Sequence, residues 1–87
     1  MGVPIEGSDI VAVYLEYFLV DEDQESLEYE ISTCPNDPDP VRVRVFREPG
    51  YPVPVVRGAK VAANKAVRKI MQLGARGEWP RGGLIQS

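Results

Sequence analysis

Two glutamates and one cysteine are the residues of this chain whose types could support catalysis. Glu28 and Glu30 stand two positions apart in an alternating segment, so their carboxylates project from the same side of a strand at a separation that glycosidases use. Cys34 is the only cysteine, and the sequence contains no histidine that could serve as a general base or activate its thiol. We therefore interpret the chain as non-catalytic. Glu28 and Glu30 are interpreted as structural residues, because Arg42 and Arg44 on the next expected strand would pair with them.

Metal and cofactor motifs are not found either. The acidic run Asp21–Glu25 begins like a calcium-binding loop, but Ser26 stands where that loop requires glycine, and Ser32 stands where it requires a bidentate glutamate. No glycine-rich segment matches a phosphate-binding fingerprint. We expect no metal and no cofactor. The acidic run, like Asp37 and Asp39 in a proline-rich segment, is interpreted as a solvated turn.

Charge is divided along the chain. Residues 1–50 contain twelve acidic and three basic side chains, a charge of −9, whereas residues 51–87 contain one acidic and seven basic side chains, a charge of +6. The net charge is −3 and the isoelectric point is near 4.9. The balance argues against nucleic-acid binding over the whole surface, although the basic part could attract anions.

The length of 87 residues, with 44% apolar and 26% charged side chains, is typical of one globular domain. Met1–Asp9 lacks the basic start of a signal peptide. The longest apolar run, Ile10–Leu15, is far shorter than the roughly 20 residues that span a bilayer. Together with the single cysteine, these features predict a soluble, cytoplasmic protein that does not bind a membrane.

Three segments alternate apolar and polar side chains with the two-residue period of β-strands: residues 9–20, 26–33 and 41–47. Three prolines between the last two segments favour a loop. Pairing Leu19 with Leu27 across the acidic turn keeps the apolar residues of the first two segments on one face. The sequence therefore predicts a three-stranded antiparallel meander.

The second and third segments carry complementary charges on the face opposite the apolar residues. In antiparallel pairing, Glu30 lies opposite Arg42, and Glu28 lies opposite Arg44. Each exposed pair of this kind contributes only about 0.2 to 1 kcal/mol. The pairs therefore indicate the register of the strands more than they stabilise the sheet.

A change of period predicts one helix at residues 58–73, with Gly74 as the residue that follows its end. The positions at helical spacing are Ala59, Ala63, Ala66, Val67, Ile70 and Met71. The connector before the helix contains several prolines. A short fourth strand at Val53–Val56, on the edge of the sheet, is compatible with this segment. Residues 75–87 are interpreted as a glycine-rich tail with Trp79 as a candidate anchor.

These elements define an α+β fold, a three-stranded or four-stranded antiparallel meander packed on one C-terminal helix. In the order of its elements the chain is similar to the β-β-β-α folds of integrase arm-binding and AP2 domains. No sequence motif of either family is present, so the similarity concerns topology and implies nothing about function.

Aromatic side chains on the outer face of the expected sheet suggest a contact surface. Tyr14, Phe18 and Phe46 project there beside Arg42 and Arg44 if the helix covers only the other face. The alternative is that the tail folds over them. Both outer strands are open edges, which favours pairing between two copies of the chain. We expect a protein-interaction module that binds another protein or itself, as a homodimer or as an adaptor or inhibitor subunit.

The basic helix is a second candidate contact surface. Arg57 and Lys60 lie at its expected start, where free amide groups and the helix dipole attract anions. Lys65, Arg68 and Lys69 extend the patch along the helix. The alternative function is a nucleic-acid-binding regulator that uses the helix and the tail. A merely solvated helix face is the third interpretation.

Overall fold

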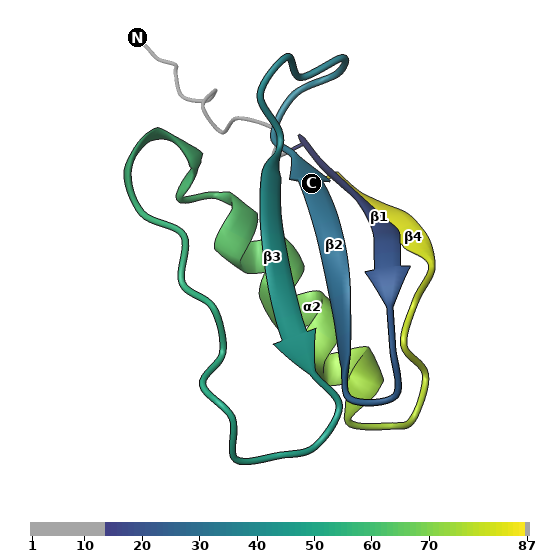
Figure 1. Ribbon diagram of the computed structural model, residues 1–87. Coiled ribbons are helices and arrows are strands. Elements are labelled where there is room, and N and C mark those ends of the chain that lie inside the picture. The colour runs from purple at the N-terminus through teal and green to yellow at the C-terminus, as the bar shows by residue number, and fades with distance from the viewer. Residues whose placement is uncertain (1–13, 87) are drawn as a thin grey trace, which may run out of the picture.

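A four-stranded antiparallel sheet with one helix on one of its faces makes up the α+β fold of the protein (Figure 1). The computed structural model describes residues 14–86. The strand order is β3-β2-β1-β4, so the strands β1, β2 and β3 form the expected meander. The elements are β1 (Tyr14–Glu22), β2 (Ser26–Ser32), β3 (Val41–Phe46), a 3-10 turn η1 (Gly58–Lys60), α2 (Ala63–Gly74) and β4 (Gly82–Gln86).

Strand boundaries differ from the predicted ones mainly in the first strand. The part of the predicted segment 9–20 that precedes Tyr14 lies outside the described residues, and β1 continues past Val20 to Glu22. The other two strands each end one residue earlier than predicted. The alternating pattern therefore located all three strands.

The fourth strand is formed by the tail. In β4, Leu84 lies opposite Glu16 and Gly83 lies opposite Tyr17. Gly83 suits this place because a Cβ there would lie 2.5 Å from the Tyr17 hydroxyl oxygen. The segment 75–87, interpreted as a glycine-rich tail, therefore contains a strand at residues 82–86 that the sequence analysis missed.

The short edge strand left open at Val53–Val56 is not formed. The segment belongs to no strand of the sheet. Pro52 and Pro54 supply the reason, since neither has a backbone N–H that could enter a ladder of hydrogen bonds. The edges of the described sheet are β3 and β4, and β1 lies between two neighbours instead of forming an open edge.

The register of β2 and β3 is the predicted one, with Glu30 opposite Arg42 and Glu28 opposite Arg44. The register of β1 and β2 is shifted by two residues from the prediction. Leu19 lies opposite Tyr29, and the pairing slips between Leu19 and Asp21 at a bulge. A shift of two residues leaves every side chain on its predicted face, so alternation could not distinguish the two registers.

Asp23 explains where the chain reverses. Its Oδ1 accepts hydrogen bonds from the backbone N–H groups of Glu25, at 2.8 Å, and Ser26, at 2.7 Å. The N–H of Glu25 is the first of the contacts that lower the pKa of Asp23. This side chain fixes a turn tighter than the predicted one, and β1 accommodates the extra residue as the bulge near Val20.

The core lies between the sheet and α2. It contains buried side chains from three strands and four from the helix: Leu15, Tyr17, Leu27, Tyr29, Ile31, Val43, Val45, Ala63, Ala66, Val67 and Ile70. The alanines allow the helix to approach the strands closely. The Tyr29 hydroxyl donates a hydrogen bond to the carbonyl oxygen of Pro80 at 2.7 Å. Burial raises the pKa of Tyr29 to about 12.

The predicted helix 58–73 is two elements. Gly58 adopts a φ of 80°, which begins the turn η1, and α2 starts only at Ala63. Ala62 precedes α2 without a side-chain cap. The predicted helix start was therefore wrong because the pattern of apolar residues does not distinguish a 3-10 turn from the first turn of an α-helix.

The end of α2 also differs from the prediction, which placed Gly74 after the helix. Gly74 is its last residue, and Gly77, with a φ of 79°, makes the turn that follows. The indole of Trp79 packs against Gly74, where a Cβ would lie 2.3 Å from the ring. Gly74 is therefore needed for close approach and not for a left-handed conformation. No helix within residues 14–86 is long and apolar enough to cross a membrane.

Candidate protein-interaction surface

One face of the sheet is covered by α2, and no helix among the described residues lies on the other, which we call the outer face (Figure 1). By alternation from the core positions, the outer face carries side chains from all four strands. They include Tyr14, Glu16, Phe18, Asp21, Ser26, Glu28, Glu30, Arg42, Arg44, Phe46 and Leu84.

The exposed apolar part of the outer face lies over β1 and β4. Phe18 is 46% exposed and Leu84 is 55% exposed. Phe18 lies opposite Gly82, so Leu84 is its diagonal neighbour on the same face. A Cβ at Gly82 would contact the Phe18 ring at 3.5 Å, which places this ring over the backbone of β4. Phe18 and Leu84 thus form one apolar patch.

The tail does not cover the predicted aromatic residues. Trp79 and Ile85 pack against the core on the side of α2, whereas Leu84 is exposed beside Phe18. β4 therefore widens the outer face. The alternative in which the tail folds over this face is wrong.

Phe46 does not join the patch of Phe18. It lies at the end of β3, where its ring stacks on Tyr51 with centroids 4.5 Å apart and an interplanar angle of 19°. β2 separates β3 from β1, and its outer side carries Glu28 and Glu30. The three aromatic residues predicted to share one surface are thus divided by a charged region.

Tyr14 lies near the end of the patch on β1. Its hydroxyl donates a hydrogen bond to Oε1 of Glu16 at 2.9 Å. This bond is the largest of the effects that raise the pKa of Tyr14. Tyr14 therefore presents a partly buried ring whose polar end is already paired within the chain.

The charged region contains both predicted ion pairs. Arg42 Nε lies 3.4 Å from Glu30 Oε2, and Arg44 Nη2 lies 2.9 Å from Glu28 Oε1. The Arg42 side chain is 59% exposed, whereas that of Arg44 is 37% exposed. The two pairs confirm the charge complementarity read from the sequence.

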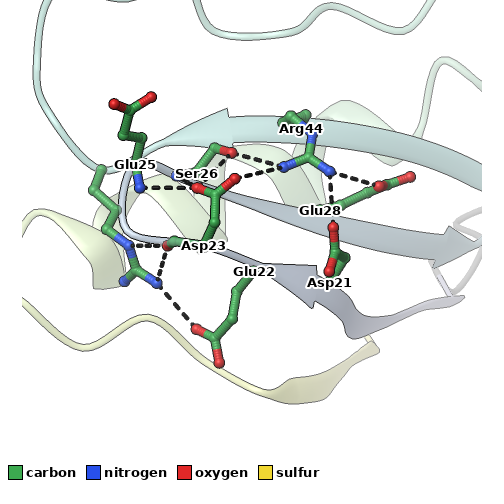
Figure 2. A network of polar contacts seen from close by, with 8 residues as sticks. Asp21, Glu22, Asp23, Glu25, Ser26, Glu28 and Arg44 are labelled. Carbon is green, nitrogen blue, oxygen red and sulfur yellow. Dashed lines mark hydrogen bonds and ion pairs between the residues drawn. The ribbon is translucent and has the colours of Figure 1, made fainter.

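Arg44 also has partners that the sequence did not indicate. Figure 2 shows its guanidinium between Asp21, Ser26 and Glu28. Nη1 donates to the Ser26 hydroxyl at 2.6 Å, and Nη2 lies 3.2 Å from Asp21. The hydrogen bond with Asp21 is the first of the contacts that raise the pKa of Arg44. Arg44 therefore joins the turn to β2 and β3, and few of its donors remain for a partner.

The predicted anion site at the helix start loses Lys60, which forms an ion pair within the protein. The ammonium group of Lys60 contacts the carboxylate of Asp37, whose side chain is only 1% exposed. Asp37 is thus not the solvated turn residue predicted from the sequence. Arg57 precedes η1 and is separated from the start of α2. Lys60 and the first turn of α2 therefore do not form a common anion site with Arg57.

Lys65, Arg68 and Lys69 are exposed on α2. None of them forms an ion pair with another described residue. They lie on the side of α2 that faces away from the sheet, since the helix buries Ala63, Ala66, Val67 and Ile70 against the core. The structure thus separates an acidic sheet face from a basic helix face.

Potential metal ligands and nucleophiles do not cluster elsewhere within residues 14–86. This part of the chain contains no group of three or more His, Cys, Asp or Glu side chains that could hold a metal ion. Cys34 is exposed and unpaired. Comparison with protein-family models, with curated proteins and with solved structures finds no match.

Proposed function

We propose that the protein is a non-catalytic interaction module whose outer face binds another protein. The observation that carries this proposal is the exposed patch of Phe18 and Leu84 on a sheet face that no described helix covers. Contiguous apolar side chains rimmed by polar ones are characteristic of protein-protein contact sites. We also propose a cytoplasmic location, which the single, unpaired Cys34 supports because reducing compartments keep thiols free.

The charge around the patch indicates the kind of partner. The outer face carries four carboxylates and two guanidinium groups, and the latter are already paired with carboxylates. An acidic surround favours a partner whose apolar contact residues are ringed by lysine and arginine. It also disfavours a face-to-face dimer, because two copies would bring like charges together.

Substitution of Phe18 tests the proposal. Phe18→Ser removes the centre of the patch and changes the free energy of unfolding by less than about 1 kcal/mol, because the side chain is half exposed. Val61→Ser is the control, since Val61 is 56% exposed but precedes α2. Affinity capture from the source cell should recover a partner with the wild type and with Val61→Ser, and lose it with Phe18→Ser.

Two results would contradict the proposal. One is equal capture by all three proteins, which would place the contact elsewhere. The other is a large loss of stability in Phe18→Ser without loss of the partner, which would make Phe18 a structural residue. Sedimentation equilibrium of the wild type shows whether the captured partner is a second copy of the chain.

Nucleic-acid binding is the second candidate, favoured by the unpaired cations Lys65, Arg68 and Lys69 on α2. Titration with duplex DNA and with RNA at low salt tests it. A regulator should bind with a steep salt dependence, and replacing each lysine or arginine with glutamine should reduce the slope by about one unit per lost phosphate contact. Absence of binding at low salt, with the protein partner still captured, would exclude this function.

A further inference from the structure

The proline-containing segment between β3 and η1 spans a cavity. We call residues 47–56 the strap. Figure 1 shows the chain leaving the end of β3 and running back, apart from the sheet, to the turn before α2. The strap is held at both of its ends by specific polar contacts.

At the first end, Arg47 fixes the strap to the turn between β1 and β2. Its backbone N–H donates to the carbonyl oxygen of Glu25 at 2.9 Å, and its guanidinium donates to the carbonyl oxygen of Asp23 at 3.0 Å and 3.1 Å. At the other end, the Asn64 side chain accepts from the N–H of Val56 at 2.8 Å and donates to its carbonyl oxygen at 2.7 Å. The two ends are therefore clamped to separate elements.

Between the clamps the strap has little support from the rest of the protein. From Pro52 to Val55, no backbone group hydrogen-bonds to another described residue. Tyr51, Val53 and Val55 are exposed by 52%, 47% and 61%. Pro52 and Pro54 prevent the strap from closing as a fifth strand, because they cannot donate to β3.

Beneath the strap lies a cavity of about 350 Å³. The end of β3 contributes Val45 and Phe46, α2 contributes Met71, and the turn after α2 contributes Trp79. Prolines of the strap complete a mostly apolar lining, to which Arg47 and Glu48 add two charged residues of opposite sign. The volume is at the lower end of the range for sites that enclose a bound group, so it suits one large apolar side chain.

An unused strand edge adjoins this cavity. β3 is the outermost strand on its side of the described sheet, so every second residue turns its N–H and C=O groups away from β2. Residues 52–55 of the strap form no backbone hydrogen bond with these groups. An extended peptide could pair with them and direct alternate side chains toward the cavity.

The charge near the cavity specifies the peptide further. Asn64, Met71 and Ala75 define the side of α2 that faces the strap and the cavity, and Arg68 shares that side by helical spacing. Arg68 forms no ion pair with another described residue. An acidic side chain next to the apolar anchor, on the side of α2, would complement this cation.

We propose that this groove binds an extended acidic segment of a partner protein. The segment pairs with the free edge of β3 beneath the strap, places one large apolar side chain in the cavity, and lays a carboxylate beside Arg68. This site is separate from the outer face and does not depend on the proposed function of that face.

A peptide-display selection on the full chain tests the specificity. A random peptide library should yield sequences that alternate apolar and other residues, with Asp or Glu beside an aromatic or large aliphatic residue. The enriched peptide, made without tryptophan, should change the fluorescence of Trp79, which is the only tryptophan of the protein. A selection that yields no sequences, or basic or proline-rich ones, would overturn the proposal.

Two matched pairs of variants locate the binding. Arg68→Glu should weaken peptide binding by at least about fivefold at low salt, whereas Lys69→Glu, the same charge change on the next residue, should have little effect. Ala75→Phe should fill the cavity and abolish binding, whereas Gln72→Phe, on a side of α2 that does not line the cavity, should not. Equal effects within either pair would overturn the proposed site.

The use of the strand edge is tested with peptides N-methylated at alternate residues. Methyl groups on one set of alternate nitrogens block the hydrogen bonds to β3, and methyl groups on the other set point away from it. One peptide should therefore bind and the other should not. Equal binding of both peptides would exclude pairing with β3. Circular dichroism of the protein variants serves as the control that each variant is folded.

Discussion

The ammonium nitrogen of Lys60 lies 2.8 Å from both carboxylate oxygens of Asp37, and this contact ties the loop between β2 and β3 to the turn before α2. Asp37 also accepts hydrogen bonds from the backbone N–H groups of Thr33, at 3.0 Å, and Asp39, at 2.9 Å. The Lys60 hydrogen bond, followed by these two, holds the pKa of Asp37 well below its usual range.

Asp37→Asn should lower the midpoint of urea unfolding at neutral pH, because it removes the charge that pairs with Lys60. The pH dependence has a defined sign. Since folding lowers the pKa of Asp37, its contribution to the free energy of unfolding is present at pH values above its ordinary pKa of 3.8. This contribution is lost as the pH falls below that value. The difference between wild type and Asp37→Asn in urea unfolding should therefore shrink in acid.

Asp39→Asn is the control for this contact, because the Asp39 side chain forms no ion pair with another described residue. It should leave the midpoint nearly unchanged. A Lys60→Met and Asp37→Asn double mutant should be more stable than the sum of the two single changes predicts. Strict additivity would show that the two residues do not interact in solution.

Gly74→Ala tests the close approach of Trp79. An alanine in the body of a helix is normally more favourable than glycine by about 1 kcal/mol. Here the added Cβ would lie 2.3 Å from the indole, so we expect a net destabilisation of about 1 to 3 kcal/mol and a red-shifted Trp79 emission in chemical denaturation and fluorescence assays.

Gly77→Ala separates crowding from backbone strain. Gly77 has a φ of 79°, but nothing lies within 4 Å of a Cβ built there. This variant should lose stability through its backbone conformation while the native Trp79 emission stays the same. A stabilised Gly74→Ala would mean that the indole does not pack on α2.

Tyr29 should make the protein sensitive to alkali. Burial raises its pKa to about 12 from an ordinary value of 10.0, so its contribution is complete below pH 10 and is lost as the pH rises to about 12. The shift corresponds to about 2 to 3 kcal/mol. Unfolding measured by circular dichroism should become progressively easier across this interval.

Tyr29→Phe should lose about 1 kcal/mol at neutral pH, because the hydrogen bond to Pro80 is removed. Between pH 10 and 12 its free energy of unfolding should then fall less than that of the wild type. A smaller pH dependence remains, because burial also raises the pKa of Tyr17. Identical alkaline profiles would show that Tyr29 does not control this transition.

Arg44 and Arg42 should differ in their importance. Arg44→Met disconnects Asp21, Ser26 and Glu28, whereas Arg42→Met removes longer contacts of a more exposed side chain. We expect the urea midpoint to fall further for Arg44→Met, and the difference between the variants to narrow at high salt. The reverse order would show that the network in Figure 2 does not stabilise the turn.

The sequence was sufficient to predict the fold class and the register of β2 and β3, since alternation and opposite charges agreed there. Alternation alone restricts a register to steps of two, so it could not reveal the bulge near Val20. The turn that caused it depends on hydrogen bonds of a single side chain, Asp23. Asp23 and Asp37 were interpreted as solvated because their partners are distant in the sequence or are backbone groups.

The predicted contact surface was only partly anticipated. Phe18 and Tyr14 were placed on the correct face, but Leu84 was missed as part of it because β4 contains two glycines and shows little alternation. The stacking of Phe46 on Tyr51 depends on how the strap turns after β3, and no periodic pattern encodes it. Trp79 was recognised as an anchor, but its contact with Gly74 could not be read from spacing.

The pairing of β4 with β1 has a consequence for folding. The two hairpins that join β1, β2 and β3 form from neighbouring segments, whereas β4 must return across most of the described chain. During synthesis β1 emerges well before β4 exists. The edge of β1 is therefore open to strand exchange between partly folded copies until β4 pairs with it.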